Sequence, residues 1–132
     1  MSHRLHLFLW LALIASACPA QSLFAANPTF AEQEFVLMPS QAQQLASEAL
    51  DGSGDAALRL SRFYSNVAVN LDEALRWAIV GAENGDANCA FTAYALLNTR
   101  VSPDDRKRAQ FWLRRAAKQG YKPAEEVLGP SS

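Results

Sequence analysis

Histidine and cysteine are scarce in this chain of 132 residues, which has two of each. Both histidines, His3 and His6, stand near the N-terminus, so the rest of the chain has no Ser-His or Cys-His nucleophile pair and no histidine metal ligand. A glycine-rich phosphate loop, a cluster with metal-ligand spacing and a strand-like alternation are also missing. We therefore expect an all-α protein with no catalytic residue, no metal site and no cofactor.

The N-terminus has the layout of a secretory signal peptide. Arg4 precedes the apolar residues 5–14, a run too short to span a membrane, and Ala15 and Ala17 supply the small residues of a cleavage site. We expect residues 1–17 to be removed and the mature protein to be secreted across the inner membrane into a bacterial periplasm. The alternative is a buried N-terminal helix.

Two outcomes are open at the cleavage point. Cys18 follows Ala17 directly, and residues 14–18 resemble a bacterial lipobox in which Ala15 stands where leucine is typical. Lipidation of Cys18 would anchor the protein to a membrane and would be its only link to one. Ordinary cleavage after Ala17 or a little later would leave it without an anchor.

The segment that follows, residues 18–39, holds three of the six prolines among small and polar residues. We expect it to form a tether. The alternative is that its apolar side chains lie against the first helix; these are Phe30, Phe35, Val36 and Leu37.

Removal of residues 1–17 leaves 11 of the 12 basic residues against 13 acidic residues, because only Arg4 is lost, and the net charge becomes −2. That balance, in a protein outside the cytoplasm, argues against nucleic-acid binding. Cys89 has no disulfide partner once Cys18 is lipidated or removed. We expect Cys89 to be a buried structural thiol rather than a reactive one.

The strongest pattern in the chain is an internal repeat with an offset of 35 residues. Four landmarks recur at that offset: Ala74, Trp77, Ala82 and Gly85 match Ala109, Trp112, Ala117 and Gly120. In a second series, a glycine is followed four residues later by a small residue: Gly52 and Ala56, Gly85 and Cys89, Gly120 and Ala124. A step of four stays on one helix face, so we expect each glycine to end one helix and a second amphipathic helix to follow.

These residues resemble the Sel-1-like repeat family, a relative of the tetratricopeptide repeats. The matches are Gly85, Asp86, Ala87, Ala109, Trp112, Ala116, Ala117, Gly120, Ala124, Leu128 and Gly129. The resemblance covers residues 52–129 and implies a short α-α superhelix, or solenoid. It would contain two full helix-pair repeats, an N-terminal capping helix and a C-terminal half repeat. The repeat domain would span residues 40–129, with residues 130–132 as a tail.

The chain departs from the family pattern in its loops and at one glycine. Residues 65–70 and 98–103 replace the family's Gly-x-Gly loop and contain no glycine. Gly81 stands where the first alanine of a pair is usual. These departures concern the loop conformation and not the pairing of helices.

Local signals place the helix boundaries. Residues 40–43 and 70–73 resemble capping boxes, Asp86 is a further expected N-cap, and Pro103 after Ser102 favours a helix start. The expected helices are residues 40–50, residues 53–65, the Trp77 helix from residue 70, residues 86–97, the Trp112 helix from residue 102, and residues 122–128. Because the two tryptophans stand at matched positions, we expect them to pack between repeats and not to bind a ligand.

Two surfaces are candidates for binding a partner. On the Trp112 helix, the basic residues Lys107, Arg114 and Lys118 fall in one stripe, with Arg108 and Arg115 beside it. Such a stripe suits an acidic partner or membrane phosphates, and a solvated helix face is the alternative.

The second candidate surface is the inner face of the first helix of each repeat, which lines the concave side in helical-pair solenoids. Its candidate contacts are Leu58, Arg62, Phe91 and Tyr94. Exposed aromatic side chains here would suit a peptide or a partner helix. Burial of the same side chains in the core is the alternative.

The family resemblance implies a non-catalytic protein-binding module, an adaptor or regulator of an envelope complex, with a protein as its partner. One alternative is an immunity protein that neutralises a periplasm-acting toxin such as a phospholipase effector. A second alternative is a hydrolase like those among the cysteine-rich members of the family. The position of both histidines and the small number of cysteines argue against a hydrolase. The oligomeric state is left open.

Overall fold

The computed structural model describes residues 36–129, and this range holds six helices and no strand. The helices are α2 (Pro39–Leu50), α3 (Gly54–Asn66), α4 (Leu71–Glu83), α5 (Ala87–Asn98), α6 (Pro103–Lys118) and α7 (Lys122–Leu128). The proposed signal peptide, the lipidation candidate Cys18, most of the tether and the tail at residues 130–132 lie outside the described residues.

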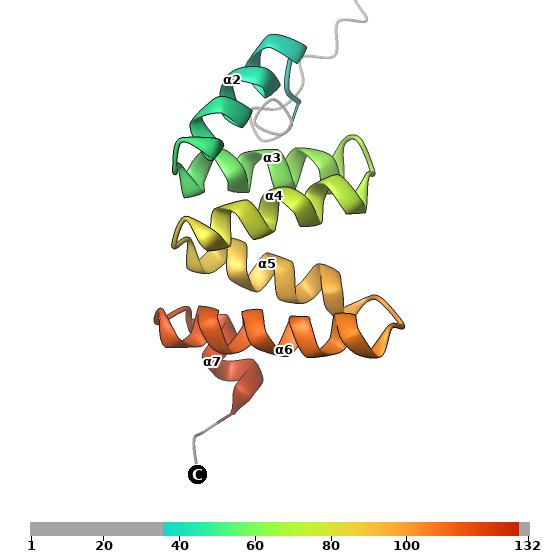
Figure 1. Cartoon of the computed structure of the whole chain (residues 1–132), viewed down its shortest axis with the longest axis vertical. Helices are drawn as coiled ribbons and strands as arrows, with labels where there is room; N and C mark the ends of the chain where they lie inside the picture. Colours follow the sequence, from blue (N-terminus) through green and yellow to red (C-terminus); the bar gives the residue numbers. More distant parts are fainter. Residues whose placement is uncertain (1–35, 130–132) are drawn as a thin grey trace, which may run out of the picture.

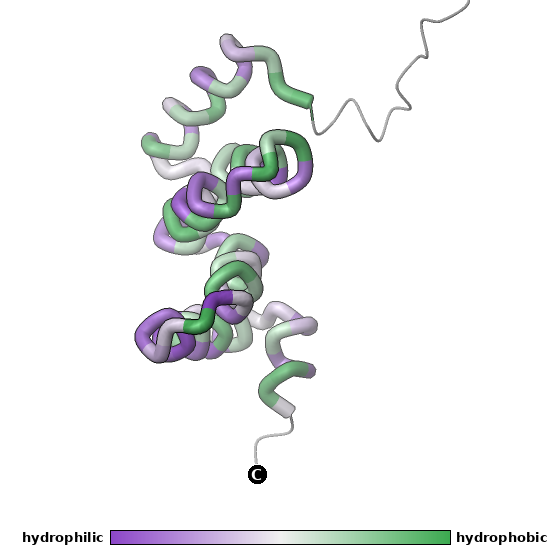
Figure 2. Tube along the Cα trace, turned by 90° about the vertical axis from the view of Figure 1, so that its right-hand side faces the viewer, coloured by the Kyte–Doolittle hydropathy of each residue, from purple (hydrophilic) through white to green (hydrophobic). Residues whose placement is uncertain are grey.

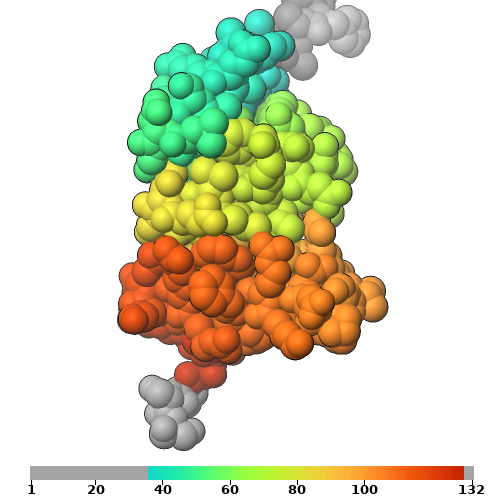
Figure 3. Space-filling model, viewed as in Figure 1, coloured from blue at the N-terminus to red at the C-terminus, as the bar shows by residue number. Residues whose placement is uncertain are grey.

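The helices stack in two layers along one axis (Figure 1). In Figure 3, α2, α4 and α6 form the visible face and largely hide α5, and Figure 2 shows α3, α5 and α7 on the other side of the stack. Helices α3 and α4 form one pair and α5 and α6 a second, while α2 covers the first pair and α7 follows the second. The prediction of an all-α, solenoid-like stack is therefore confirmed.

Three of the helix starts are held by a side chain that accepts a hydrogen bond from a backbone N–H of the first turn. Asp86 accepts from Cys89 at 2.6 Å, Asn70 accepts from Glu73 at 3.2 Å, and Ser53 accepts from Ala56 at 3.2 Å. The capping role of Asp86 is confirmed. Only half of the predicted capping box at residues 70–73 is formed, because the Glu73 carboxylate bonds the Arg76 guanidinium at 3.0 Å instead.

The capping box predicted at residues 40–43 is wrong. Helix α2 begins at Pro39, and Gln41, not Gln43, accepts the reciprocal hydrogen bond, from the Met38 N–H at 2.8 Å. The shift has a local cause: a residue before proline is held extended, as Met38 is with φ −69° and ψ 150°, and proline suits the first helical position. Pro39 therefore belongs to the helix and not to the tether.

Glycines end α2, α4 and α6, as the repeat pattern predicts. Gly52, Gly85 and Gly120 have φ angles of 108°, 92° and 81°, in the region that L side chains rarely adopt. A Cβ atom at any of them would meet open space, so the backbone angle and not crowding requires glycine.

The loop between α3 and α4 makes a similar turn without glycine. Val69 adopts a φ of 49°, and the Asn70 N–H donates to the Tyr64 carbonyl at 2.7 Å. An ion pair between Arg100 and Asp72 joins the end of the second loop to the start of α4. These contacts shape the chain around two loops that contain no glycine.

The core consists of two clusters that meet at α4. Trp77 points into the cluster between α2, α3 and α4, whose other buried members are Leu45, Ala49, Ala56, Ala57 and Leu60. Trp112 belongs to the cluster that runs from α3 to α7, in which alanines and leucines dominate. The two tryptophans are 4% and 5% exposed, so each places a large ring inside a core that is otherwise built mainly of alanines and leucines.

Gly81 lies where α4 packs closely against α5 and α3. A Cβ atom on Gly81 would collide with the Cys89 sulfur and would lie 2.9 Å from the Cys89 Cβ and 3.0 Å from the Ala57 Cβ. The missing side chain of Gly81 thus makes room for Cys89, which is larger than the alanine at matched positions. Glycine instead of alanine at position 81 of α4 therefore compensates for cysteine instead of alanine at position 89 of α5.

We predict that Trp112→Ala lowers the free energy of unfolding by about 3–5 kcal/mol, because it removes a buried ring and leaves a cavity. Phe111→Ala, the neighbouring but half-exposed ring, should cost about 1 kcal/mol or less and serves as the control. Urea unfolding followed by circular dichroism measures both. Equal losses for the two variants would show that Trp112 does not carry the packing.

We also predict that Gly81→Ala destabilises the protein by about 1–2 kcal/mol, because crowding against Cys89 outweighs the gain in helix propensity. Adding Cys89→Ala should recover part of the loss, since the sulfur is the nearest atom. A double-mutant cycle by urea unfolding checks the coupling. Strictly additive effects would contradict it.

Candidate functional site

Cys89 is free and fully buried at the start of α5. Its sulfur lies 3.6 Å from the Gly54 carbonyl oxygen, to which the thiol donates. A helix N-terminus favours a thiolate, but burial raises the pKa of the Cys89 thiol well above its ordinary value, and the nearby Asp86 carboxylate raises it further. Cys89 is therefore kept protonated and inaccessible, which is unsuited to a nucleophile.

Neither a candidate metal-binding cluster nor a membrane-spanning helix occurs among the described residues. Residues 36–129 contain no group of three or more histidine, cysteine, aspartate or glutamate side chains that could hold a metal ion. No helix in this range is long and apolar enough to cross a membrane.

The first helices of the two repeats do not offer the open face that we expected. Leu58 is only 7% exposed and belongs to the core cluster, so its prediction as a partner contact is wrong. Its neighbour Ser61 is fully buried and donates to the Ala74 carbonyl at 2.8 Å. The register of α3 turns this face toward α4, which buries it. Arg62, one residue further on, is exposed.

Phe91 and Tyr94 are half-buried and pack against the core. Their ring centroids lie 5.5 Å apart, and Tyr121, just before α7, places its ring 5.3 Å from Phe91. The Tyr121 hydroxyl also lies 3.4 Å from the Asn88 amide oxygen. This aromatic group joins α5 to α7, so the half repeat at the C-terminal end already uses the rings that we expected to meet a partner.

Of the predicted basic stripe on α6, Lys107 stands apart. Its ammonium group lies 3.6 Å from the Asp104 carboxylate, one turn earlier on the same exposed helix face. Arg114 and Lys118 are both exposed, and together they line a groove further along the helix. Within the predicted stripe, Lys107 therefore forms a local ion pair, and Arg114 and Lys118 line a concave surface.

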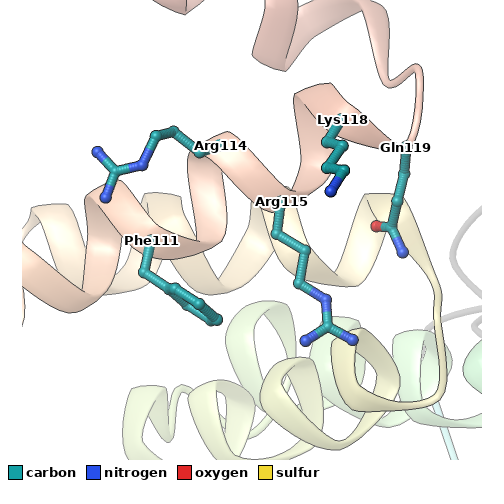
Figure 4. Close-up of a pocket in the computed structure, with 5 residues that line it drawn as sticks. All are labelled: Phe111, Arg114, Arg115, Lys118 and Gln119. Carbon is teal, nitrogen blue, oxygen red and sulfur yellow. The ribbon is translucent and has the colours of Figure 1, made fainter.

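We name this concave surface the α6 groove, and it has a volume of about 570 Å³. Its lining residues are Phe111, Arg114, Arg115, Lys118 and Gln119. Figure 4 shows all five side chains leaving one stretch of α6, with Phe111 and Arg115 directed to the same side of the helix. Phe111 is 51% exposed and contacts Trp112 edge to face, with ring centroids 5.0 Å apart.

The charges of the α6 groove have one sign. Arg114, Arg115 and Lys118 form no ion pair among residues 36–129, as is also true of Arg59, Arg62, Arg106 and Arg108. What sets the three apart is that they line one concave surface with no carboxylate in its lining. The last turn of a helix favours cations, which accounts for part of this clustering. It does not account for an exposed phenylalanine among them.

Two contacts hold the floor of the groove in place. The Arg115 guanidinium lies over the Trp112 ring, 5.5 Å from its centroid. The Gln119 amide donates to the Gly85 carbonyl at 3.2 Å and so ties the end of α6 to the end of α4. Both contacts reduce the side-chain freedom that binding would otherwise remove.

The first repeat has no equivalent surface. At the offset of 35 residues, the groove positions correspond in α4 to Arg76, Ile79, Val80, Glu83 and Asn84. Val80 packs against the cluster shared with α2, and Asn84 donates to the Ala49 carbonyl of α2 at 2.7 Å. Helix α2 therefore covers Val80 and Asn84, whereas the matched residues Arg115 and Gln119 line the α6 groove.

Sequence reasoning found Arg114 and Lys118, placed Arg115 beside them and missed Phe111 and Gln119. The spacing could have found Phe111, because residues 107, 111, 114 and 118 lie on one helical face. The change from Arg76 to Phe111 at matched positions was a second available signal.

Comparisons with models of known families, with curated proteins and with solved structures found no match to this chain. The likeness to Sel-1-like repeats therefore rests on the repeat residues themselves.

We predict that an alkylating reagent modifies Cys89 only as fast as the protein unfolds, because the thiol is buried and its pKa is raised. Mass spectrometry of the tryptic peptide of residues 77–100 follows the reaction, and a urea-unfolded sample gives the upper rate. Rapid modification under native conditions would place the thiol at the surface and reopen a chemical role.

Proposed function

We propose that this chain is a non-catalytic protein-protein interaction module of a bacterial periplasm, where it acts as an adaptor or regulator of an envelope complex. The α6 groove is the observation that carries the proposal. An exposed aromatic ring beside three cations without acidic partners in the described residues is typical of a surface that meets another protein.

Two further observations support this proposal. The cysteine in the described range is a buried thiol, and that range holds no histidine, so it offers no Ser-His or Cys-His pair to the hydrolase alternative. The resemblance to Sel-1-like repeats and the signal-peptide layout of residues 1–17 favour a secreted binding module.

The experiment is site-specific photo-crosslinking in the periplasm with the tagged, full-length gene product. A crosslinking amino acid replaces Gln110, an exposed residue beside the α6 groove, and the control replaces Gln43, an exposed residue of α2. Mass spectrometry identifies the captured chains. Envelope-assembly proteins captured from position 110 would support an adaptor. A single stoichiometric partner with hydrolase features would favour the immunity protein, and capture from neither position would contradict both.

We predict that Lys107→Glu combined with Arg114→Glu leaves the melting temperature nearly unchanged but abolishes capture of the partner. Both side chains are exposed, Arg114 has no ion pair in the described residues, and loss of the Lys107–Asp104 pair costs only about 0.5 kcal/mol. Arg59→Glu with Arg106→Glu, two exposed residues outside both the predicted stripe and the groove lining, is the matched control. Unchanged capture would show that the partner binds another surface and that the basic stripe is only a solvated helix face.

A further inference from the structure

We propose that the α6 groove binds an acidic peptide segment of a partner protein, in which carboxylates flank an apolar side chain. This inference rests on the proposed function and specifies the ligand chemistry. The apolar side chain lies on Phe111, and the carboxylates meet Arg114, Arg115 and Lys118. Three features of the groove support this assignment: its exposed ring, its charges and its polar end.

The exposed ring supplies an apolar anchor point. Half of Phe111 faces solvent inside the groove, although the neighbouring Trp112 ring is buried beneath it. An aromatic ring held by a second ring presents a rigid apolar surface whose burial costs little side-chain entropy. An apolar side chain of the ligand would remove this ring from water.

The charges select carboxylates. Arginine guanidinium groups bind carboxylates through two parallel hydrogen bonds, and Arg114 and Arg115 bring two such groups to the groove. Stacking on Trp112 holds Arg115 in place before a ligand arrives. Lys118 adds a third cation one turn beyond Arg114. Repulsion among the three cations in the free protein is relieved when carboxylates bind.

The polar end of the groove suits a peptide backbone. The amide nitrogen of Gln119 donates to the Gly85 carbonyl, which orients its amide oxygen without using it as an acceptor. That oxygen can accept a hydrogen bond from a backbone N–H of the ligand. A free carboxylate ion has no N–H group to donate in this place.

A peptide fits these observations better than an anionic membrane. Residues 36–129 contain 11 basic residues, since Arg4 lies outside, and 11 acidic residues, since Glu32 and Glu34 lie outside, so this part of the chain carries no net charge. A flat bilayer is attracted by a broad positive face. The α6 groove is instead concave and local, and one aromatic ring, Phe111, is part of its lining.

The test measures binding of a fluorescein-labelled peptide in which glutamates flank a leucine and a phenylalanine. Comparison peptides replace the glutamates by glutamines or the apolar pair by alanines. Vesicles of phosphatidylcholine with and without phosphatidylglycerol test the membrane as the alternative. We expect the glutamate peptide to bind about tenfold or more tightly than either comparison peptide, and the affinity to fall as salt is added.

Variants locate the binding. Arg114→Glu with Lys118→Glu should weaken the glutamate peptide about tenfold or more, and Phe111→Ala should weaken it by a similar factor. Arg59→Glu with Arg106→Glu makes the same charge change at two exposed residues outside the groove lining and the predicted stripe, and should change affinity less than about twofold. Thermal melting of every variant verifies that it is folded.

Three outcomes would overturn the inference: equal binding of the glutamine peptide, equal loss in the control variant, or binding of anionic vesicles but of no peptide. The proposed function fails separately. If a partner is still crosslinked from position 110 while no acidic peptide binds, the interaction module stands and the ligand chemistry is wrong. If the peptide binds but no chain is captured in the periplasm, the assignment of the groove's ligand is supported and the proposed role as an interaction module is wrong.

Discussion

The close approach of helix backbones is the constraint on which the rest of the structure depends. Fully buried alanines stand wherever neighbouring helices touch; they are Ala49, Ala57, Ala74, Ala78, Ala82, Ala90, Ala93, Ala109, Ala116 and Ala124. Small side chains let helices pack at short distances, but they bury little apolar surface each. The stack therefore needs a few large side chains at fixed positions, and Trp77 and Trp112 fill that role in the two core clusters.

The same constraint explains how a cysteine replaces alanine at one of the matched positions of the repeat. Cys89 is larger than the alanines at its matched positions. It fits because Gly81, which faces it from α4, has no side chain. Burial and the cap Asp86 then keep the thiol protonated. A cysteine that looks chemically interesting in the sequence is thus a consequence of volume matching between α4 and α5.

The helices could be predicted from the sequence because their signals are local. Asp86 as an N-cap, the glycines that end helices and the helix at residues 122–128 depend on residues within a turn of each other. The face that each helix buries depends on its neighbours in space. Leu58 was placed on an open face by family analogy, whereas α4 covers that face in the structure. Phe111 shares a helix face with Arg114 and Lys118, which is a local signal, but whether a neighbouring helix covers that end of α6 depends on the fold, as α2 shows for Asn84 at the end of α4.

The two repeats share an architecture and differ in what covers their second helix. On α4, α2 lies against Val80 and accepts the Asn84 hydrogen bond, so this face is internal. On α6 the matched positions hold Arg115 and Gln119, and the end of α4 supplies a single carbonyl to Gln119. Among the described residues, no helix covers these positions of α6 in the way that α2 covers α4. A cation and an amide stand there instead, beside the exposed Phe111 ring, so the place where the repeat departs from its own pattern is where binding is best sought.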